Sequence, residues 1–290
     1  MAMPNITESF TVRNTVPAAF AASDSLLGKI GSLEVRLARS AEEVEAAQEV
    51  RYRVFCEELG AQVMVPGAAA AGRDIDAFDD ICDHLIVCDR NLPGPDNQRV
   101  VATYRLLPQE RAVMNGGFYS ASEFDLDALV ARNRNLRFVE LGRSCVLPAY
   151  RNKRTVEAMW QAIWAYVRRN SIDVMAGCAS FHGTVPAGHA EPLSFLWHNC
   201  RAEGDWAVRA LPRRFSSMDL MPPEAINAKS ALAAMPPLIK GYLRLGARFG
   251  EGCVVDHEFG TTDVFVVLPV SFISQRYIDY YSGESQVLVA

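Results

Sequence analysis

The sequence contains no long hydrophobic run, and no apolar stretch approaches the ~20 residues that a helix needs to span a bilayer. Its first residues, MAMPNITESFTVRN, lack the cationic start and apolar core of a secretory signal. The net charge of -5 at pH 7 excludes the overall basic character typical of nucleic-acid binding. We therefore expect a soluble, cytoplasmic protein that does not bind nucleic acid. The composition leaves open a peripheral contact with the inner face of the membrane.

Patterns for disulfides, metals and nucleophiles are also missing. The seven cysteines are an odd set without a Cys-x-x-Cys pair, which predicts reduced thiols rather than a disulfide framework or a zinc ribbon. The five histidines lack the spacing of metal ligands. Ser144 and Cys145 have no Gly-x-Ser-x-Gly context, so a serine or cysteine nucleophile is not expected. We expect no metal and no tightly bound cofactor.

What is present is the composition of an ordinary globular protein, with 50% apolar and 22% charged residues in a chain of 290. This length suits one large domain with a substantial core. Residues 1–30 are polar and rich in Ala and Ser, which predicts a weakly structured N-terminal tail. Residues 31–212 form the predicted core, and residues 213–290 an extension that completes the same domain.

Hydrophobic periodicity predicts an α/β protein. Apolar and polar residues alternate at 32–38, and Ser40 with Glu43 has capping-box spacing at the start of a helix that runs to about residue 59. The clearest helix covers 153–170, whose apolar residues recur at three- and four-residue spacing. Further strands are expected at 84–89, 99–108, 136–147, 172–181, 206–212 and 262–269, and further helices at 122–133, 192–204, 236–250 and 271–281. This order has too few βαβ units for a doubly wound sheet and predicts a mixed sheet flanked by helices.

Two charges interrupt the apolar strand FVELGRSCVL. Glu140 lies among residues that indicate a strand covered on both faces, where burial would raise the pKa of a carboxylate and make it a general base; the alternative is a side chain that faces solvent. Arg143 would point to the opposite face from Glu140 unless Gly142 permits a bulge. The alternative for Arg143 is a simple ion pair.

A basic turn follows this strand and precedes the helix at 153–170. Arg151, Lys153 and Arg154 stand where a helix N-terminus offers free N–H groups, up to about Thr155. This arrangement indicates an anion site for a phosphate, and a solvated basic turn is the alternative. The glycine-rich run that wraps backbone around a pyrophosphate is missing here.

The loop DIDAFDDICDH at 74–84 carries five aspartates. Such a run is usually solvated, and its functional alternative is a site for a cationic amine. Arg51 and Phe55 lie one helical turn apart on the preceding helix, where they could anchor a ligand or form ordinary helix surface and core.

The segment VLPAYRNKRTVEAMWQAIW resembles motif A of the GNAT acyltransferase fold, which implies a mixed, mostly antiparallel central sheet flanked by helices. The polar residues resemble those of acyl-homoserine lactone synthases, and four motifs occur in the same order. These are Arg-x-x-x-Phe at Arg51 and Phe55, Asp-x-x-Asp at Asp76 and Asp79, Arg-Leu-x-Pro from Arg105 to Pro108, and Glu-x-x-Arg at Glu140 and Arg143.

From about Leu33 to Tyr281 the chain is similar to the ornithine–acyl-carrier-protein N-acyltransferases, a branch whose C-terminal part resembles PPLIKGYLRLGARFGEG and FGTTDVFVVLP here. This resemblance implies transfer of a 3-hydroxy fatty acyl group from acyl carrier protein to the α-amine of ornithine, giving a lyso-ornithine lipid. Residues 31–212 would then be the acyltransferase core. The glycines of coenzyme-A-binding members are replaced by Asn152, Arg154 and Val156, which favours a donor whose phosphopantetheine is attached to acyl carrier protein. That acidic partner would meet basic residues by charge complementarity, namely Arg132, Arg134, Arg137, Arg151, Lys153 and Arg154.

The resemblance implies roles for the site residues. Glu140 would deprotonate the ornithine ammonium directly or through water, Arg143 would orient Glu140 or the acyl carbonyl, and a backbone N–H near Cys145 and Val146 would stabilise the oxyanion. The phosphate would lie near Arg151, Lys153, Arg154 and Thr155. The amino-acid substrate would meet Arg51, Phe55, Asp76, Asp79 and Arg105, with the two aspartates either binding the side-chain amine or organising the arginines. Alternative functions are an acyl-homoserine lactone synthase, an acetyl-CoA-dependent acetyltransferase, and a non-catalytic protein that binds acyl carrier protein or lipid.

Overall fold

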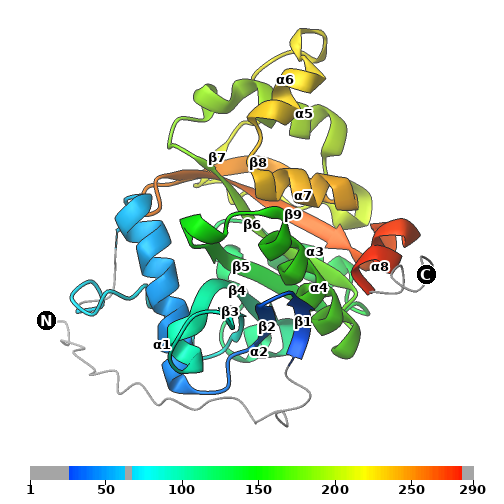
Figure 1. Cartoon of the computed structure of the whole chain (residues 1–290). Helices are drawn as coiled ribbons and strands as arrows, with labels where there is room; N and C mark the ends of the chain where they lie inside the picture. The colour runs from blue at the N-terminus through cyan, green and yellow to red at the C-terminus, as the bar shows by residue number, and fades with distance from the viewer. Residues whose placement is uncertain (1–25, 63–66, 283–290) are drawn as a thin grey trace, which may run out of the picture.

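A computed structural model of the chain describes residues 26–62 and 67–282. Within these ranges a single nine-stranded sheet runs through the molecule in the order β1-β2-β3-β4-β5-β6-β9-β8-β7, with helices on both of its faces (Figure 1). The strands are β1 (Leu26–Ile30), β2 (Leu33–Leu37), β3 (Asp83–Asp89), β4 (Val100–Pro108), β5 (Phe138–Val146), β6 (Val174–His182), β7 (Phe215–Ser216), β8 (Arg248–Asp256) and β9 (Thr261–Pro269). The helices are α1 (Ala41–Arg51), α2 (Gln109–Met114), α3 (Leu126–Arg132), α4 (Lys153–Arg169), α5 (Ala190–Cys200), α6 (Ala228–Ala234), α7 (Pro237–Leu245) and α8 (Gln275–Ser282).

The sheet is mixed and mostly antiparallel, as predicted. Every neighbouring pair of these strands is antiparallel except β5 and β6. Strands β8 and β9 come from the segment 213–290 and join the same sheet, because β9 pairs with β6 along its whole length. No helix within the described ranges combines the length and hydropathy of a membrane-spanning segment.

Alternation along each strand divides the core between the two faces of the sheet. On β3, Leu85 and Val87 pack on the face that α4 covers, whereas Ile86 and Cys88 pack against α1. The α1 face continues across the sheet into a second cluster beneath α3, which includes Phe138 of β5. Both faces are therefore buried, which explains why these strands are apolar at nearly every position.

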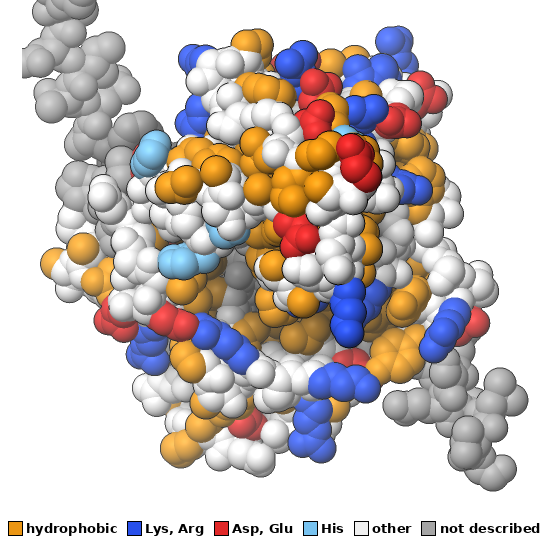
Figure 2. Space-filling view, turned by 90° about the horizontal axis from the view of Figure 1, so that it is seen from above, with side chains coloured by type: hydrophobic (Ala, Val, Ile, Leu, Met, Phe, Trp, Pro, Cys, Tyr) orange, Lys and Arg blue, Asp and Glu red, His pale blue; other side chains and the backbone are white. Residues whose placement is uncertain are grey.

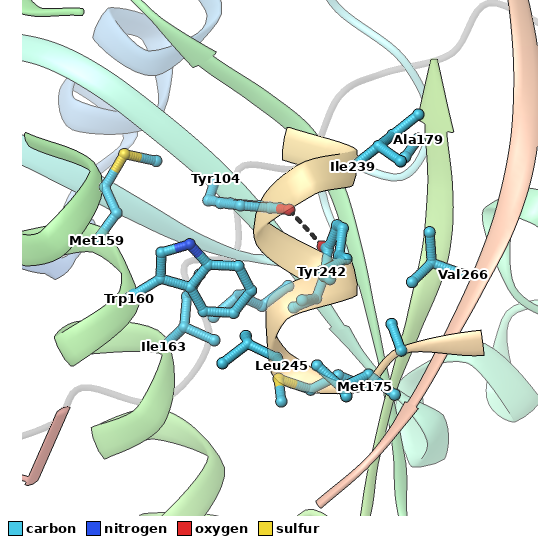
Figure 3. Close-up of a cluster of buried hydrophobic side chains, with 14 of the residues drawn as sticks. Tyr104, Met159, Trp160, Ile163, Met175, Ala179, Ile239, Tyr242, Leu245 and Val266 are labelled. Atoms are coloured by element: carbon cyan, nitrogen blue, oxygen red, sulfur yellow. Dashed lines mark hydrogen bonds between the residues drawn. The ribbon is translucent and has the colours of Figure 1, made fainter. Parts of the chain in front are cut away.

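Helix α4 confirms the clearest helix prediction and fixes the apolar face. Asn152 caps it by accepting the N–H of Thr155 at 3.2 Å. Its Trp160 meets Tyr242 of α7 edge to face, with ring centroids 5.5 Å apart. The Tyr242 hydroxyl in turn shares a buried 2.7 Å hydrogen bond with Tyr104 of β4 (Figure 3). This chain of contacts ties α4 and α7 to the centre of the sheet.

The structure differs from the predicted elements near both ends of the chain. Leu26–Ile30, within the predicted tail, form β1, because Leu27 is buried in the core and the strand pairs with β2. The helix expected at 236–250 ends at Leu245, since Gly246 adopts a left-handed φ of 93° that terminates it. The residues that follow form β8, which the helix prediction had partly absorbed.

Three smaller differences have local causes. The helix expected at 122–133 begins at Leu126, because Asp125 rather than Ser122 caps it. The helix expected at 192–204 ends earlier, at Cys200. The strand expected at 206–212 contributes only isolated bridges, at Arg209 and Ala210.

Strands β5 and β6 separate after a short parallel contact. Their pairing covers only Phe138–Glu140 against Val174–Ala176. The next residue of β6, Gly177, has a φ of 150°, and a Cβ there would lie 2.2 Å from the carbonyl oxygen of Leu141. The two strands therefore approach too closely at this point for any side chain, and beyond it they diverge.

We predict that Gly177→Ala lowers the free energy of unfolding by about 1–3 kcal/mol, because the new methyl group must displace backbone at the point of divergence. Gly142→Ala is the matched control on the neighbouring strand. A Cβ at Gly142 meets no atom within 4 Å, so this variant should unfold like the wild type. Chemical denaturation of the three proteins compares them, and equal midpoints would contradict the close approach described above.

Candidate functional site

A cavity of about 270 Å³ opens where β5 and β6 diverge. Glu140, Arg143 and Ser144 of β5, with Cys178 and Ser180 of β6, line it. Aromatic and apolar side chains complete the walls, among them Phe55, Leu59, Tyr104, Leu107, Tyr119, Leu141, Leu238 and Phe259. Figure 2 shows a hollow near the centre of one face, with apolar side chains inside it and histidine and basic side chains around it. The cavity is therefore an apolar pocket with a few convergent polar groups, as ligand sites commonly are.

A β-bulge in β5 brings its two charges to one face. Gly142 pairs with Arg105 and Cys145 with Thr103, so that two residues, Arg143 and Ser144, stand opposite one residue of β4. Cys145 consequently packs on the α1 face, the same side as Phe138, although the two lie an odd number of residues apart. The sequence allows a bulge at Gly142, and the structure contains one, but the residue that adopts the left-handed conformation is Arg143, with a φ of 50°. A non-glycine residue in that conformation is strained, which is common at functional sites.

Glu140 is 4% exposed and its carboxylate points toward the turn that precedes α3. It accepts the N–H groups of Tyr119 at 2.7 Å and Ser120 at 2.8 Å. Burial raises the pKa of Glu140, and the hydrogen bonds from Ser120 and Tyr119 oppose that rise. The result is a fixed, desolvated carboxylate at the cavity wall, rather than the solvent-facing side chain that was the alternative.

Arg143 pairs with aspartates and aromatic rings instead of with Glu140. Its guanidinium lies 4.2 Å from the ring centroid of Phe259 and 5.0 Å from that of Tyr119. One nitrogen donates to Asp76 at 3.2 Å, while the buried Nε has no hydrogen-bond partner. Tyr119 thus touches Arg143 through its ring and Glu140 through its backbone, which couples the two charges. Nε forms no hydrogen bond but lies 3.5 Å from a carboxylate oxygen of Asp74, and the guanidinium lines the cavity, where its positive charge can attract an anionic group.

Beneath Arg143 lies a buried ion network of three arginines and three aspartates. Arg51 holds Asp79 with two hydrogen bonds of 2.7 and 2.8 Å and donates from Nε to Asp74 at 2.9 Å. Arg105 bonds Asp76 at 2.6 Å and Asp79 at 3.1 Å. Helix α1, strand β4 and the loop at 74–79 are joined by these bonds, and Arg143 adds strand β5.

The ion pairs of the network determine whether its aspartates are free to bind a substrate. Burial alone would raise the pKa of Asp79, but the Arg51 charge outweighs it and the pKa is far below its usual range. The Asp79 carboxylate accepts from two arginines, from Gln48 and from the N–H of Asp76, so it has no capacity left for a substrate. Of the two interpretations of Asp76 and Asp79, the geometry therefore supports the one in which they organise the arginines.

The expected substrate contacts divide into two groups. Phe55 lines the cavity and packs edge to face on Phe259, with centroids 5.7 Å apart. Arg51, one turn earlier, is fully buried in the network. A π-helical segment at Tyr52–Glu58 continues α1 and carries Phe55. Arg105 lines the cavity with its guanidinium between the network and the rings of Phe78 and Tyr119.

Sequence reasoning missed three acidic residues at the far end of the cavity. Carboxylate oxygens of Glu123, Asp256 and Asp263 lie within 4.8 Å of one another. Asp263 interrupts the apolar strand TDVFVVLP just as Glu140 interrupts β5, and that shared pattern was the signal that could have found it. Tyr119 and Ser120, which hold Glu140, lie outside any predicted element and gave no such signal.

The amide of Val146, rather than that of Cys145, is directed at the gap between β5 and β6. Leu147 donates its N–H to Val101 of β4 at 3.0 Å, and alternate amides of a strand point to opposite sides. Cys145 pairs with Thr103 and its N–H faces β4, whereas Val146 faces the side on which β6 has moved away. Burial raises the pKa of the Cys145 thiol to about 12, so it is no nucleophile.

The basic turn after β5 is only partly free. Arg151 is held by Glu58 through two hydrogen bonds of 2.5 and 2.6 Å and by the carbonyl of Val146 at 2.9 Å. Thr155 is fully buried and its N–H belongs to the Asn152 cap. Lys153 and Arg154 are exposed on the first turn of α4.

The other expected carrier contacts lie elsewhere. Arg132, Arg134 and Arg137 precede β5, whereas Lys153 follows it, so the two groups are separated by the length of the strand, about 25–30 Å. Arg137 is moreover paired with Glu110 at 2.6 Å. The six basic residues expected to meet acyl carrier protein therefore fall into two groups at opposite ends of β5.

Known proteins resemble this chain in sequence and in fold. A sequence profile of the acetyltransferase (GNAT) domain matches residues 50–161. The L-ornithine N(alpha)-acyltransferase of Brucella abortus is 61% identical over 91% of this chain and 94% of its own length. The L-ornithine N(alpha)-acyltransferase of Agrobacterium fabrum is 58% identical over 91% of this chain and 90% of its own. The solved structure of the acyl-homoserine lactone synthase LasI covers 87% of this chain and 96% of its own, at 12% identity and a TM-score of 0.48.

We predict that Asp79→Asn lowers the free energy of unfolding by about 3–5 kcal/mol, because it leaves Arg51 and Arg105 buried with too little negative charge. Glu203→Gln removes one partner of an exposed pair with Arg201 and is the control, with an expected change of about 0–1 kcal/mol. Urea unfolding of both variants measures the difference. If Asp79→Asn were as stable as the control, the network would not be the structural element that its geometry indicates.

Proposed function

Because the chain belongs to the L-ornithine N(alpha)-acyltransferase family, we propose that it transfers a 3-hydroxy fatty acyl group from a thioester donor to the α-amine of L-ornithine, giving a lyso-ornithine lipid. The observation that carries this proposal is the cavity itself. A desolvated carboxylate at Glu140 and the guanidinium of Arg143 share one apolar pocket at a break in the sheet.

Glu140 is the base of the proposed reaction. An amine is nucleophilic only after it has lost its proton, and a carboxylate whose pKa is raised by burial accepts that proton more readily. The free amine then attacks the carbonyl carbon of the thioester, a C–N bond forms, the C–S bond breaks, and the departing thiolate takes up a proton. The amide product and a free thiol are released.

Two further groups would orient the reactants. The Val146 N–H, which faces the gap between the strands, would stabilise the oxyanion of the tetrahedral intermediate. The guanidinium of Arg143, which lines the cavity, would receive the α-carboxylate of the amino acid, since a guanidinium suits a carboxylate in geometry and charge. In this arrangement Arg143 positions the substrate, a change from the sequence-based expectation that it orients Glu140 or the acyl carbonyl.

The proposed donor is acyl-phosphopantetheine on acyl carrier protein. Its arm would enter between β5 and β6, with the phosphate at the first turn of α4. Lys153 and Arg154 supply exposed positive charge there, and the amides of a first helical turn have no partner within the helix. The position lacks the glycines that would let backbone wrap a larger pyrophosphate, which favours a carrier-borne phosphate over coenzyme A.

We predict that the purified protein converts ornithine and 3-hydroxyacyl carrier protein to N-acylornithine, detected by mass spectrometry. Glu140→Gln should reduce kcat by about 10²–10⁴-fold, the usual contribution of a general base. In the wild type, kcat should fall as the pH decreases through the pKa of Glu140, which lies above 4.5, because protonation removes the base.

Glu140→Asp and Glu110→Gln are the comparison variants for this test. Glu140→Asp keeps a carboxylate and should retain more activity than Glu140→Gln, while Glu110 lies outside the cavity and its variant should behave as the wild type. Thermal melting confirms folding in each case. A folded Glu140→Gln protein with full activity would refute the role of Glu140, and the absence of N-acylornithine with the wild type would refute the function.

For the donor, we predict that the double variant Lys153→Glu/Arg154→Glu raises KM for acyl carrier protein by about tenfold or more, since two attractive charges become repulsive. Acyl-pantetheine, which lacks both the phosphate and the protein, should be used equally well by the variant and the wild type. Arg134→Glu changes charge at the opposite end of β5 and is the matched control. Equal effects of the two replacements on KM would argue against docking at α4.

A further inference from the structure

The acidic group formed by Glu123, Asp256 and Asp263 contains more carboxyl groups than the neighbouring residues neutralise. Glu123 pairs with Arg214 at 2.8 Å, and one oxygen of Asp256 caps a turn by accepting the N–H of Glu258 at 2.8 Å. Among the described residues Asp263 has no ion-pair partner, so three carboxyl groups stand against one bound arginine. Such a group is relieved either by protonation of a carboxylate or by a bound cation.

Asp263 also has an unused acceptor. The residue is 7% exposed, and its Oδ1 is buried without a hydrogen-bond partner. The hydroxyl oxygen of Thr261, which lines the same end of the cavity, is likewise buried and unpartnered. The hydroxyls of Ser180 and Thr261 lie close enough to Asp263 to lower its pKa, but Oδ1 forms no hydrogen bond of good geometry. Buried polar atoms in proteins nearly always have partners, so Asp263 Oδ1 can accept from a further donor.

The group lies on the same face of the sheet as Glu140. Phe265 of β9 packs in the cluster that also contains Phe138 of β5, and Asp263 precedes Phe265 by two residues on the same strand. A short chain of contacts joins the two ends of the cavity: Ser120 donates its N–H to Glu140 at 2.8 Å, while the Cys178 thiol contacts the Ser120 hydroxyl at 3.2 Å and Glu123 at 3.6 Å.

We propose that Asp263, with Glu123, Asp256 and Thr261, binds the side-chain ammonium of the amino-acid substrate and so selects a diamino acid over a neutral one. An ammonium brings one positive charge and three N–H donors, which match Asp263 Oδ1, Thr261 Oγ1 and one further carboxylate oxygen. The inference rests on the proposed function, because it assigns the far end of the same substrate.

The electrostatics of the group support this role. Burial raises the pKa of Asp263 to about 6, against the opposing effect of the Ser180 and Thr261 hydroxyls. Burial, followed by repulsion from Asp263, raises the pKa of Glu123 to about 7. A bound ammonium would favour both ionised forms. The Arg214 charge on Glu123 disfavours a divalent metal at the same place, whereas a single positive charge can still be accommodated.

The experiment compares ornithine with norvaline, which has the same carbon chain without the side-chain amine. At saturating acyl donor, Asp263→Asn should lower kcat/KM for ornithine by about 10- to 100-fold, the loss expected for a hydrogen bond to a charged group. It should leave kcat/KM for norvaline unchanged, so the preference for ornithine collapses. Asp263→Glu retains the charge and should keep part of the preference. Glu251→Gln, on β8 outside the cavity, should change neither value.

Each outcome has a defined meaning. If the wild type acylates ornithine and Asp263→Asn keeps the same ornithine-to-norvaline ratio, this inference fails and the proposed function stands. If the wild type does not acylate ornithine, the proposed function fails. If Asp263→Asn is inactive with both substrates, thermal stabilisation of the wild type by each amino acid decides, and equal stabilisation overturns the inference. Stabilisation by Mg²⁺ or Ca²⁺ that Asp263→Asn abolishes, without an effect on ornithine, would make the group a metal site instead.

Discussion

The buried network of Arg51, Arg105 and Arg143 with Asp74, Asp76 and Asp79 is the interaction on which the site depends. It joins helix α1, strands β4 and β5 and the loop at 74–79 at one point. Three positive and three negative charges balance, so the desolvation of each is offset by close partners with good hydrogen-bond geometry. Removing any one member leaves a buried charge uncompensated, which makes the arrangement sensitive to single changes.

The same network supports the strained conformation of β5. Arg143 adopts a left-handed φ, and its side chain is held by Asp74 and Asp76 below and by the rings of Tyr119 and Phe259 beside it. Without these contacts an arginine would relax to the extended conformation and point away from Glu140. The other charges of the network therefore determine where the guanidinium of Arg143 points.

Much of this arrangement could be predicted from the sequence because it depends on local pattern. The alternation at 32–38 and the apolar stripe of α4 identified elements of the sheet and its cover, and the charges at positions 140 and 143 identified the strand at the cavity. What could not be predicted depends on long-range register. The position of the bulge follows from the pairing of β5 with β4, and the saturation of Asp79 follows from arginines 28 and 26 residues away.

The predictions that the structure contradicts also fail because of long-range contacts. The sequence pattern predicts a helix through residues 248–250, because Phe249 continues the helical spacing of α7. The end of that helix is visible only in the φ of Gly246. In sequence, Asp263 belongs to an apolar strand and gives little sign of a site. The acidic group forms only when folding brings it next to Asp256 of β8 and Glu123, which precedes α3.

The short parallel contact between β5 and β6 has a mechanical consequence. Only three residue pairs join β1–β5 to the group formed by β6, β9, β8 and β7, so the sheet consists of two well-paired halves with a narrow seam. Glu140 and Arg143 belong to one half, and Asp256 and Asp263 to the other. A molecule that contacts both sets acts as a clamp across the seam, and its length sets the separation at which the halves are most stable. The selectivity of such a site then resides as much in the stiffness of the sheet as in the side chains, since a loose seam would adapt to a longer or shorter molecule.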